Sequence, residues 1–337
     1  MRLAGIPGKP AAKIDFVSGD LYHYFLRYQT ISVRLRQKIR PLQERFRQDE
    51  SQFMKSSSFV YHAPASVSDA LGLLDSLADQ EPRIIAGGQS LVPMMAFRMA
   101  QPGHLIDING ISELSACEVS TNGLRVGALV RHARFEKPVT DGPLGKLLSY
   151  VMHHIAHAPI RTRGTFCGSL AHADPASEWC LTAVTLGATV EAQSSRGTRL
   201  ISADELLAGL MSTTLAPDEI IVAAHLPLLS QDARFGFYEF SRRPGDYAMA
   251  MSLVTFEQEN GRISNARIGV GGAEDRPRRS ETAEAALNGK RPGKIAFEAA
   301  ANAAATEIEP MEDIQATAEY RRDLVRVAVR RALEQTQ

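Results

Sequence analysis

The sequence predicts an α+β protein, in which strands and helices form separate layers of two medium-sized domains. The length of 337 residues suits two such domains, and a hydrophobic fraction of 44% is ordinary for a globular chain. Between about residues 66 and 226, short strand patterns and helical patterns follow one another. After residue 230, three strand patterns come in succession and three helical patterns follow, an order typical of an antiparallel sheet with helices packed on one face.

Before residue 230, the elements are predicted from apolar spacing and from turn residues. A helix is predicted to begin at Ser66, because Ser66 and Asp69 resemble a capping box and apolar residues follow at helical spacing. Its apolar face is formed by Val67, Ala70, Leu71 and Leu74. Strands are predicted at residues 83–86, 105–108, 124–130, 188–193 and 220–225, and further helices at residues 144–157 and from about 175 to 187.

The C-terminal third has its own pattern. Strands are predicted at residues 233–242, 248–258 and 263–270, and the pair Asn260 and Gly261 indicates a tight hairpin between the last two. Helical periodicity then recurs at residues 280–287, 295–305 and 318–335.

Residues 1–53 differ from the rest of the chain. Basic residues crowd positions 34–47, and the one regular pattern is the helical spacing of Ile31, Leu35 and Ile39 before Pro41. We interpret this segment as an N-terminal extension that is disordered or that results from a translation start placed too early. A basic arm that docks on a partner subunit is the alternative interpretation.

Composition disfavours several classes of function. The 38 basic and 38 acidic residues balance, so nothing indicates nucleic acid or an anionic membrane surface as a partner. No apolar run approaches the roughly 20 residues that span a bilayer, and no secretory signal is recognisable, so we expect a cytoplasmic protein without a membrane span. The cysteines Cys117, Cys167 and Cys180 suit reduced thiols, and their spacing is not that of an iron–sulfur ligand set.

Two glycine-rich segments carry the chemical signal. The first reads IIAGGQSL at residues 84–91, where a β-branched run breaks into Gly87 and Gly88. Glycines at a strand end permit positive φ and let backbone N–H groups converge on an anion, and Ser90 adds a hydroxyl donor. Such a glycine pair alone is more typical of a plain turn than of a ligand site.

The second segment reads RTRGTFCGSLAHADPASE at residues 161–178 and repeats this pattern with Gly164 and Gly168. It then adds Asp174 and Glu178, whose carboxylates accept hydrogen bonds from sugar hydroxyls. Two phosphate-binding turns and carboxylates that hydrogen-bond sugar hydroxyls suit a dinucleotide. Neither segment matches GxGxxG or a Walker A loop, which disfavours the Rossmann and P-loop folds.

AGGQS at residues 86–90, followed by GTxxGSxAHADPxxE at residues 164–178, resembles the FAD-binding subunits of the molybdenum hydroxylases. This is the xanthine dehydrogenase superfamily, and the resemblance is stronger to the carbon monoxide dehydrogenase medium subunits. It runs from about Met54 to the C-terminus. It implies an FAD-binding domain of the PCMH/vanillyl-alcohol-oxidase-like class at residues 54–230, with subdomains at about 54–110 and 111–230. It also implies a carbon monoxide dehydrogenase flavoprotein-like C-terminal domain at residues 231–337, with a three-stranded antiparallel sheet.

The resemblance also implies which residues hold FAD. The first diphosphate cradle would consist of Ala86, Gly87, Gly88, Gln89, Ser90 and Leu91, and the second of Thr165, Gly168 and Ser169. The resemblance further implies that Glu178 binds the ribose or ribitol hydroxyls, and Asp174, a carboxylate of the same segment, is a second candidate for such a contact.

Three further residues are assigned to the ring systems of FAD by the same resemblance. His172 would lie beside the flavin and tune it by hydrogen bonding, and Tyr247 would cover one face of the flavin. Ile221, next to Ile220, would pack near the adenine. Taken without the resemblance, Tyr247 is equally typical of a residue packed on the sheet, and the two isoleucines are typical of a strand core.

Two features depart from a simple FAD site. Cys167 stands where the family motif T-[IV]-G-G has glycine; positive φ there would strain a cysteine, whereas a position that needs only a small side chain would accept one, and we expect the second case. His153 and His157 are predicted to share one helix face, as in half of a zinc-binding HExxH motif. Because His154 replaces the glutamate of that motif, we expect no metal site.

The function implied is that of the FAD-carrying electron-transfer subunit of a multi-subunit molybdenum hydroxylase. A large partner subunit would hold the molybdenum-pterin cofactor and a small one two [2Fe–2S] clusters, in a dimer of heterotrimers that passes electrons to an external acceptor. The absence of cluster cysteines disfavours the hydroxybenzoyl-CoA reductase variant, whose flavin subunit carries an inserted cluster loop. A self-standing FAD-dependent reductase on the same fold and a flavin-free assembly subunit are the alternatives.

Overall fold

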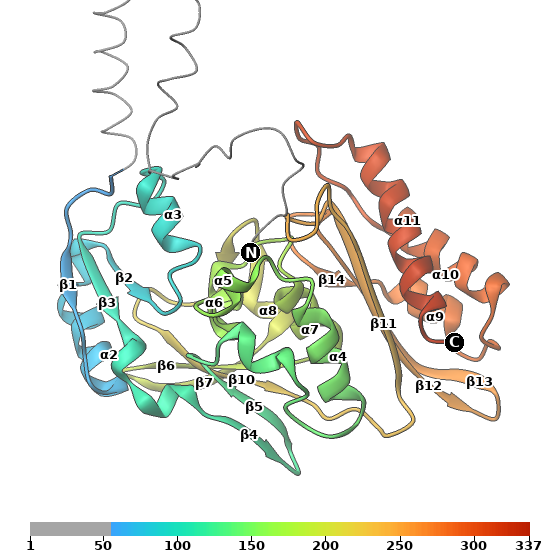
Figure 1. Cartoon of the computed structure of the whole chain (residues 1–337), viewed down its shortest axis with the longest axis horizontal. Coiled ribbons are helices and arrows are strands. Elements are labelled where there is room, and N and C mark those ends of the chain that lie inside the picture. Colours follow the sequence, from blue (N-terminus) through green and yellow to red (C-terminus); the bar gives the residue numbers. More distant parts are fainter. Residues whose placement is uncertain (1–54) are drawn as a thin grey trace, which may run out of the picture. The chain divides into compact units, whose positions relative to one another are not determined.

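The computed structural model describes residues 55–337, and the predicted N-terminal extension at residues 1–53 lies outside this part of the chain. Separate layers of strands and helices follow one another along the described residues, which confirms the predicted α+β class (Figure 1). Within residues 55–337, the structure contains no helix that is both long and apolar enough to cross a membrane.

A small parallel sheet comes first in the described chain. Its strand order is β1, β3, β2, with bounds Val60–His62 for β1, Pro82–Ile85 for β2 and His104–Asp107 for β3. Parallel neighbours require crossover connections, and the helices α2 (Val67–Ser76) and α3 (Leu91–Ala96) lie within them. The turn that leaves β2 is the first glycine segment.

Helix α2 forms as its sequence pattern predicts. The Ser66 hydroxyl accepts a hydrogen bond from the Asp69 amide at 3.1 Å, which caps the helix. The four residues predicted for its apolar face are its buried residues, Val67, Ala70, Leu71 and Leu74.

A five-stranded antiparallel sheet follows, in the order β4, β5, β10, β6, β7. Its strands are β4 (Cys117–Ser120), β5 (Gly123–Gly127), β6 (Thr189–Ser194), β7 (Gly197–Ser202) and β10 (Ile220–Leu226). The associated elements are α4 (Gly142–Met152), α5 (Ala158–Arg161), α6 (Phe166–His172), α7 (Glu178–Leu186), α8 (Ala203–Leu206), β8 (Leu207–Gly209) and β9 (Ser212–Thr213). The sequence patterns missed β4 and β7, because both are edge strands made mostly of exposed residues and so lack an apolar alternation.

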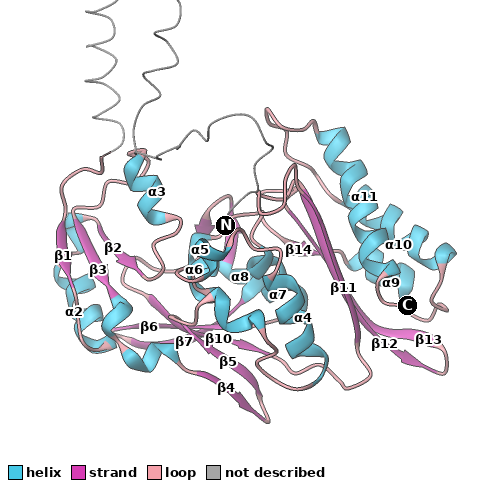
Figure 2. Ribbon diagram, viewed as in Figure 1, coloured by secondary structure: helices cyan, strands magenta, loops and turns pink. Residues whose placement is uncertain are grey.

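The C-terminal sheet has the predicted antiparallel strands β11 (Arg234–Phe240), β12 (Ala250–Glu259) and β13 (Arg262–Gly271), and a two-residue strand β14 (Arg278–Arg279) adds a fourth. Asn260 and Gly261 form the predicted hairpin, with φ angles of 52° and 75°. Three helices pack on one face of this sheet, as Figure 2 shows: α9 (Glu281–Leu287), α10 (Lys294–Glu307) and α11 (Ala318–Glu334).

Helix α7 joins the two halves of the described chain. All of its residues after Glu178 are buried, and it packs against β12 and β13 of the C-terminal sheet. Gly269 on β13 makes this contact close, because a Cβ there would lie 1.8 Å from the Thr185 hydroxyl oxygen. The C-terminal half of α7 therefore packs closely against the C-terminal sheet.

Candidate functional site

The first glycine segment lies where the chain leaves β2 and turns into α3. Gly88 has a φ of +70°, a conformation that glycine adopts without strain. Gly87 is required for another reason: a Cβ there would lie 2.4 Å from the carbonyl oxygen of Arg163 and 2.7 Å from the Cα of Gly164. The two glycine segments, distant in sequence, therefore meet backbone to backbone.

The second segment runs from α5 into α6. Thr165 caps α6, and its hydroxyl accepts a hydrogen bond from the Gly168 amide at 3.0 Å. Cys167 lies in the first turn of α6 with a helical backbone and a buried side chain, and its thiol donates to the Val126 carbonyl at 3.5 Å. No positive φ occurs at this position, so cysteine is accommodated there without backbone strain.

Two side chains that the sequence motifs did not indicate tie the segments together. Asn109 donates to the carbonyl of Ala86 at 2.7 Å and accepts from the Arg131 guanidinium at 2.6 Å. Arg131 also donates to the carbonyl of Arg163. Asn109 and Arg131 each follow a predicted strand closely, but no local pattern predicts that they meet.

Both segments line one cavity of about 1050 Å³. This size is at the upper end of the range for ligand pockets, about 300–1,000 Å³, and suits an extended ligand. The polar part of its wall includes glycines, serines and histidines, and also the charged residues Glu81, Arg83, Asp218 and Glu219. The apolar part includes Ile84, Ile85, Met94, Met99, Met211, Leu215, Ile220 and Ile221.

Most of the predicted FAD contacts lie in the wall of this cavity. These are Ala86, Gly87, Gly88, Gln89, Ser90, Leu91, Thr165, Gly168, Ser169, His172 and Ile221. Backbone amides without neighbouring Cβ atoms and two serine hydroxyls are donors suited to a diphosphate, and the isoleucines are suited to an aromatic ring. The residues present therefore fit a dinucleotide such as FAD.

Three predicted contacts lie outside the wall of the cavity. Asp174, Glu178 and Tyr247 form a separate group, in which burial and then the charges of Asp174 and Glu178 raise the pKa of the Tyr247 phenol. Tyr247 nevertheless has 67% of its surface exposed. Asp174 accepts a hydrogen bond from the Ala176 amide at 2.8 Å, which stabilises the turn before α7.

Glu178, the first residue of α7, faces a second carboxylate. Burial, and then the charge of Glu239, raise the pKa of Glu178 to about 8. Glu239 is 8% exposed, and one of its oxygens lies 3.4 Å from Nδ1 of His154. Its other oxygen has no hydrogen-bond partner among the described residues. Burial and the charge of Glu239 thus favour the protonated form of Glu178, whose carboxyl can donate as well as accept a hydrogen bond.

The predicted histidine face does not form. Helix α4 ends at Met152, so His153 is its C-cap and His157 is the N-cap of α5. The prediction of one helix face was wrong because apolar spacing continues past the true helix end. Among residues 55–337, no group of three or more metal-ligating side chains comes together.

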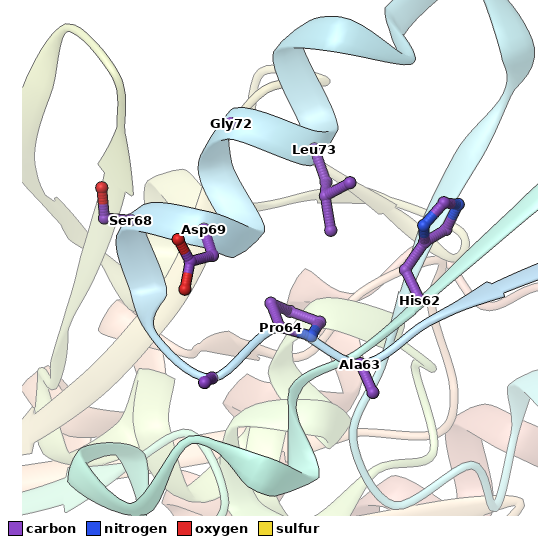
Figure 3. A pocket seen from close by; sticks show the side chains of 8 residues that line it. His62, Ala63, Pro64, Ser68, Asp69, Gly72 and Leu73 are labelled. Atoms are coloured by element: carbon purple, nitrogen blue, oxygen red, sulfur yellow. The ribbon is translucent and has the colours of Figure 1, made fainter.

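A second hollow, of about 610 Å³, lies beside the N-terminus of α2 (Figure 3). Its lining includes Ser68 and Asp69, which are both exposed, and Leu73. No buried charged group faces it within the described residues, and we assign it no role.

Residues 54–229 match the family described as FAD binding domain in molybdopterin dehydrogenase, and residues 235–336 match the CO dehydrogenase flavoprotein C-terminal domain. The chain is 41% identical over 280 residues to the nicotine 6-hydroxylase medium subunit of Paenarthrobacter nicotinovorans, an alignment that covers 83% of this chain and 98% of the relative.

Solved structures agree with this match. Carbon monoxide dehydrogenase from Hydrogenophaga pseudoflava, in a form that lacks the Mo-pyranopterin moiety of its cofactor, superposes with a TM-score of 0.81 and 34% identity. Quinoline 2-oxidoreductase from Pseudomonas putida 86 superposes with a TM-score of 0.80 and 36% identity. Each superposition covers 84% of this chain and 98% of the other.

Proposed function

Because this chain belongs to the family of FAD-binding medium subunits of molybdenum hydroxylases, we propose that it is the electron-transfer subunit of such a complex. When bound, FAD would supply the redox chemistry for transfer between the two [2Fe–2S] clusters of a small partner subunit and an external acceptor. The chain itself binds the cofactor, orients it and controls its contact with water.

The observation that carries this proposal is the close contact of Gly87 with Gly164, which places both glycine segments on one cavity. The backbone amides of residues 86–91 would hold one part of the diphosphate, with the hydroxyl of Ser90. Thr165, Gly168 and Ser169 would hold the other part.

The remaining proposed contacts concern the rest of FAD. Ile221, on the apolar wall, would pack against the adenine, and His172 would hydrogen-bond the flavin. Tyr247 would cover one flavin face and limit the access of water. Asp174 and Glu178 stand near Tyr247, and we propose that they bind ribose or ribitol hydroxyls. A protonated Glu178 could donate to such a hydroxyl.

The partners are proposed from the family and from the cysteines. The chain has three cysteines, and Cys167 and Cys180 are buried free thiols, so the iron–sulfur clusters would be held by a separate small subunit. A large subunit would hold the molybdenum-pterin cofactor, and the proposed assembly is a dimer of heterotrimers. We propose the cytoplasm as the compartment, where free thiols stay reduced.

The large subunit, rather than this chain, would contact the substrate. Nicotine and quinoline, named in two of the similar proteins, are nitrogen heterocycles. We therefore propose an aromatic nitrogen heterocycle as the substrate class. This point is tested by measuring the turnover of such compounds and of carbon monoxide by the purified complex. Faster turnover of carbon monoxide would contradict the proposed substrate class.

The electron-transfer role is tested with a complex whose flavin site is disrupted. The chain is co-expressed with the genes that flank its own, as wild type and as Gly87→Ala, with Gly72→Ala as the control because no atom lies within 4 Å of the added Cβ. We expect substrate to reduce the iron–sulfur clusters in all three complexes, and Gly87→Ala alone to lose turnover with an external acceptor. Turnover by the isolated chain with NADPH would instead support the self-standing reductase. A colourless wild-type chain in an active complex would support the assembly subunit.

A further inference from the structure

His132, which no sequence motif indicated, has a defined protonation state. The indole Nε1 of Trp179 lies 2.9 Å from Nδ1 of His132. An indole N–H can only donate, so Nδ1 must be an unprotonated acceptor. The imidazole is therefore neutral, and its single proton is on Nε2.

The surroundings of His132 favour the same state. His132 is 5% exposed, and Trp179 is fully buried. Burial, followed by the charges of Arg131 and Arg161, lowers the pKa of His132 to about 4. Trp179 is held in turn by Phe135 and Phe166, whose ring centroids lie 5.1 and 4.9 Å from its own. The donor that fixes the imidazole is therefore rigidly packed.

The Nε2–H group faces the FAD cavity without an acceptor. His132 lines the cavity, and among the described residues no atom accepts a hydrogen bond from Nε2. Gly164 packs against this edge of the ring and must be a glycine, because a Cβ at that position would lie 2.4 Å from Nε2. Nε2 is not among the fully buried polar atoms that lack a partner in the described residues, so it is accessible from the cavity and can donate to a ligand there.

We propose that His132 donates a hydrogen bond from Nε2 to an oxygen of FAD, and that Trp179 is the positioning residue that fixes the tautomer. The proposal rests on the FAD site described above and adds a contact to it. A neutral donor keeps the strength of this contact independent of pH over the physiological range. An unlocked histidine would titrate there and would change the affinity for FAD.

The tautomer is tested first, on the full-length wild-type chain labelled with ¹⁵N-histidine. We expect long-range ¹H–¹⁵N spectra to show one histidine that stays neutral, with Nε2 protonated, at every pH between about 5 and 9. Its Nε2–H resonance should shift when FAD is added to the apoprotein. An imidazolium or an Nδ1–H tautomer for His132 at pH 7 would overturn the proposal, whatever the variants do.

The contact is tested by the FAD affinity of variants. Trp179 is the only tryptophan, so quenching of its emission by energy transfer to FAD reports binding in the wild type and in the His132 variants. His132→Phe removes the donor, and we expect the dissociation constant to rise roughly ten- to hundredfold, as for loss of a hydrogen bond to an anionic oxygen. His132→Gln keeps an N–H donor and should recover part of this loss.

The positioning role has its own readout. In Trp179→Phe, followed by flavin fluorescence, the imidazole is no longer locked, so the dissociation constant should change between about pH 5 and 8, while that of the wild type stays flat. Phe135→Leu is the matched control, because it loosens the packing of Trp179 without removing a donor. The dissociation constant of Phe135→Leu for FAD should not change across the same pH range.

The outcomes separate this proposal from the FAD site itself. If wild type binds FAD but folded His132→Phe binds it within about twofold, the His132 contact is refuted and the cavity assignment stands. If His132→Phe does not fold, the FAD affinity of His132→Gln and the His132 tautomer in the wild-type spectra decide whether the contact exists. If the wild type binds no FAD, the cavity assignment itself fails.

Discussion

Gly87 is the residue at which the FAD site depends most directly on a missing side chain. We predict that Gly87→Ala pushes the two glycine segments apart, because the new Cβ would lie 2.4 Å from a backbone oxygen that cannot move freely. The expected cost is about 1–3 kcal/mol of folding stability. FAD affinity should fall by about tenfold or more.

Thermal unfolding and FAD titration of the apoprotein measure both effects. Gly72→Ala is the control: it is exposed in α2, and its added Cβ meets no atom within 4 Å. This control should be up to about 1 kcal/mol more stable, since alanine favours a helix over glycine. Equal FAD affinity in the two variants would show that the close contact at Gly87 does not matter.

Cys167 tests whether the departure from the family motif matters. Its backbone is helical and its side chain is buried, so Cys167→Ala should keep FAD binding and lose about 1 kcal/mol of stability. Chemical denaturation and FAD titration measure the two quantities. Loss of FAD from this variant would mean that the thiol has a role in the site beyond packing.

Among the site residues, the sequence predicts those whose type stands out from its neighbours. It misses common residue types that only folding brings to the site. Gly87 and Gly88 stand out in a β-branched run, so a glycine pattern finds them. Asn109, Arg131 and His132 are common residue types in loops, and only the folded chain places them beside the two segments.

At the scale of elements, the first turn of α7 carries a pH-dependent contribution to stability. The folded-state pKa of Glu178, about 8, lies above its ordinary value of 4.5, so the fold keeps a proton that the unfolded chain releases. This contribution is complete below about pH 4.5 and is lost as pH rises through about 8.

We therefore predict that Glu178→Gln flattens the pH dependence of stability. The melting temperature of the wild type should fall between about pH 5 and 8 by more than that of the variant, measured at constant ionic strength. Parallel falls for the two proteins would mean that Glu178 is ionised in the folded state.

Helix α11 holds Met249, the residue before β12, which lies two residues after Tyr247. Arg321 on α11 is 4% exposed and donates to the carbonyls of Met249 and Gly272 at 2.9 and 2.6 Å. Gly272 in turn donates to the carbonyl of Pro175, next to Asp174, at 2.8 Å. The C-terminal helix is thereby connected to both loops that carry proposed flavin contacts.

We predict that Arg321→Met destabilises the fold by about 2–6 kcal/mol, from about 1–3 kcal/mol for each carbonyl left without its donor. Arg330→Met on the same helix is the control, because its ion pair with Glu334 is solvated and contributes at most about 1 kcal/mol. Urea denaturation compares the two. Similar midpoints would mean that the buried guanidinium does not fix the loops.

Most elements could be predicted because their cores are periodic. Helix α2 and the hairpin at Asn260 and Gly261 match their patterns, whereas the edge strands β4 and β7 present too little apolar surface to be seen. The end of α4 was misplaced because tertiary packing buries Ile155 beyond the last helical turn. Apolar spacing alone does not distinguish a buried helix from the buried loop after it.

At the scale of the whole molecule, two hydrophobic cores meet at β12, which contributes buried residues to both. One core extends from α2 into β12, and the other lies between the C-terminal sheet and α9 to α11. The domain boundary near residue 230 stays a proposal, since residues of β11 and β12 belong to the first core as well. The sequence predicts two domains but not how tightly they pack, because that depends on contacts such as Gly269 with Thr185.

We propose that two glycine segments close one FAD cavity in a subunit that transfers electrons for its partners. The most direct measurement is the absorption spectrum of the full chain purified with the products of its flanking genes, followed by acid release of the chromophore. The account predicts one FAD per chain, with iron–sulfur absorbance and molybdenum in stoichiometric partners. A chain that releases no flavin would contradict it, and the two glycine segments would then be ordinary turns.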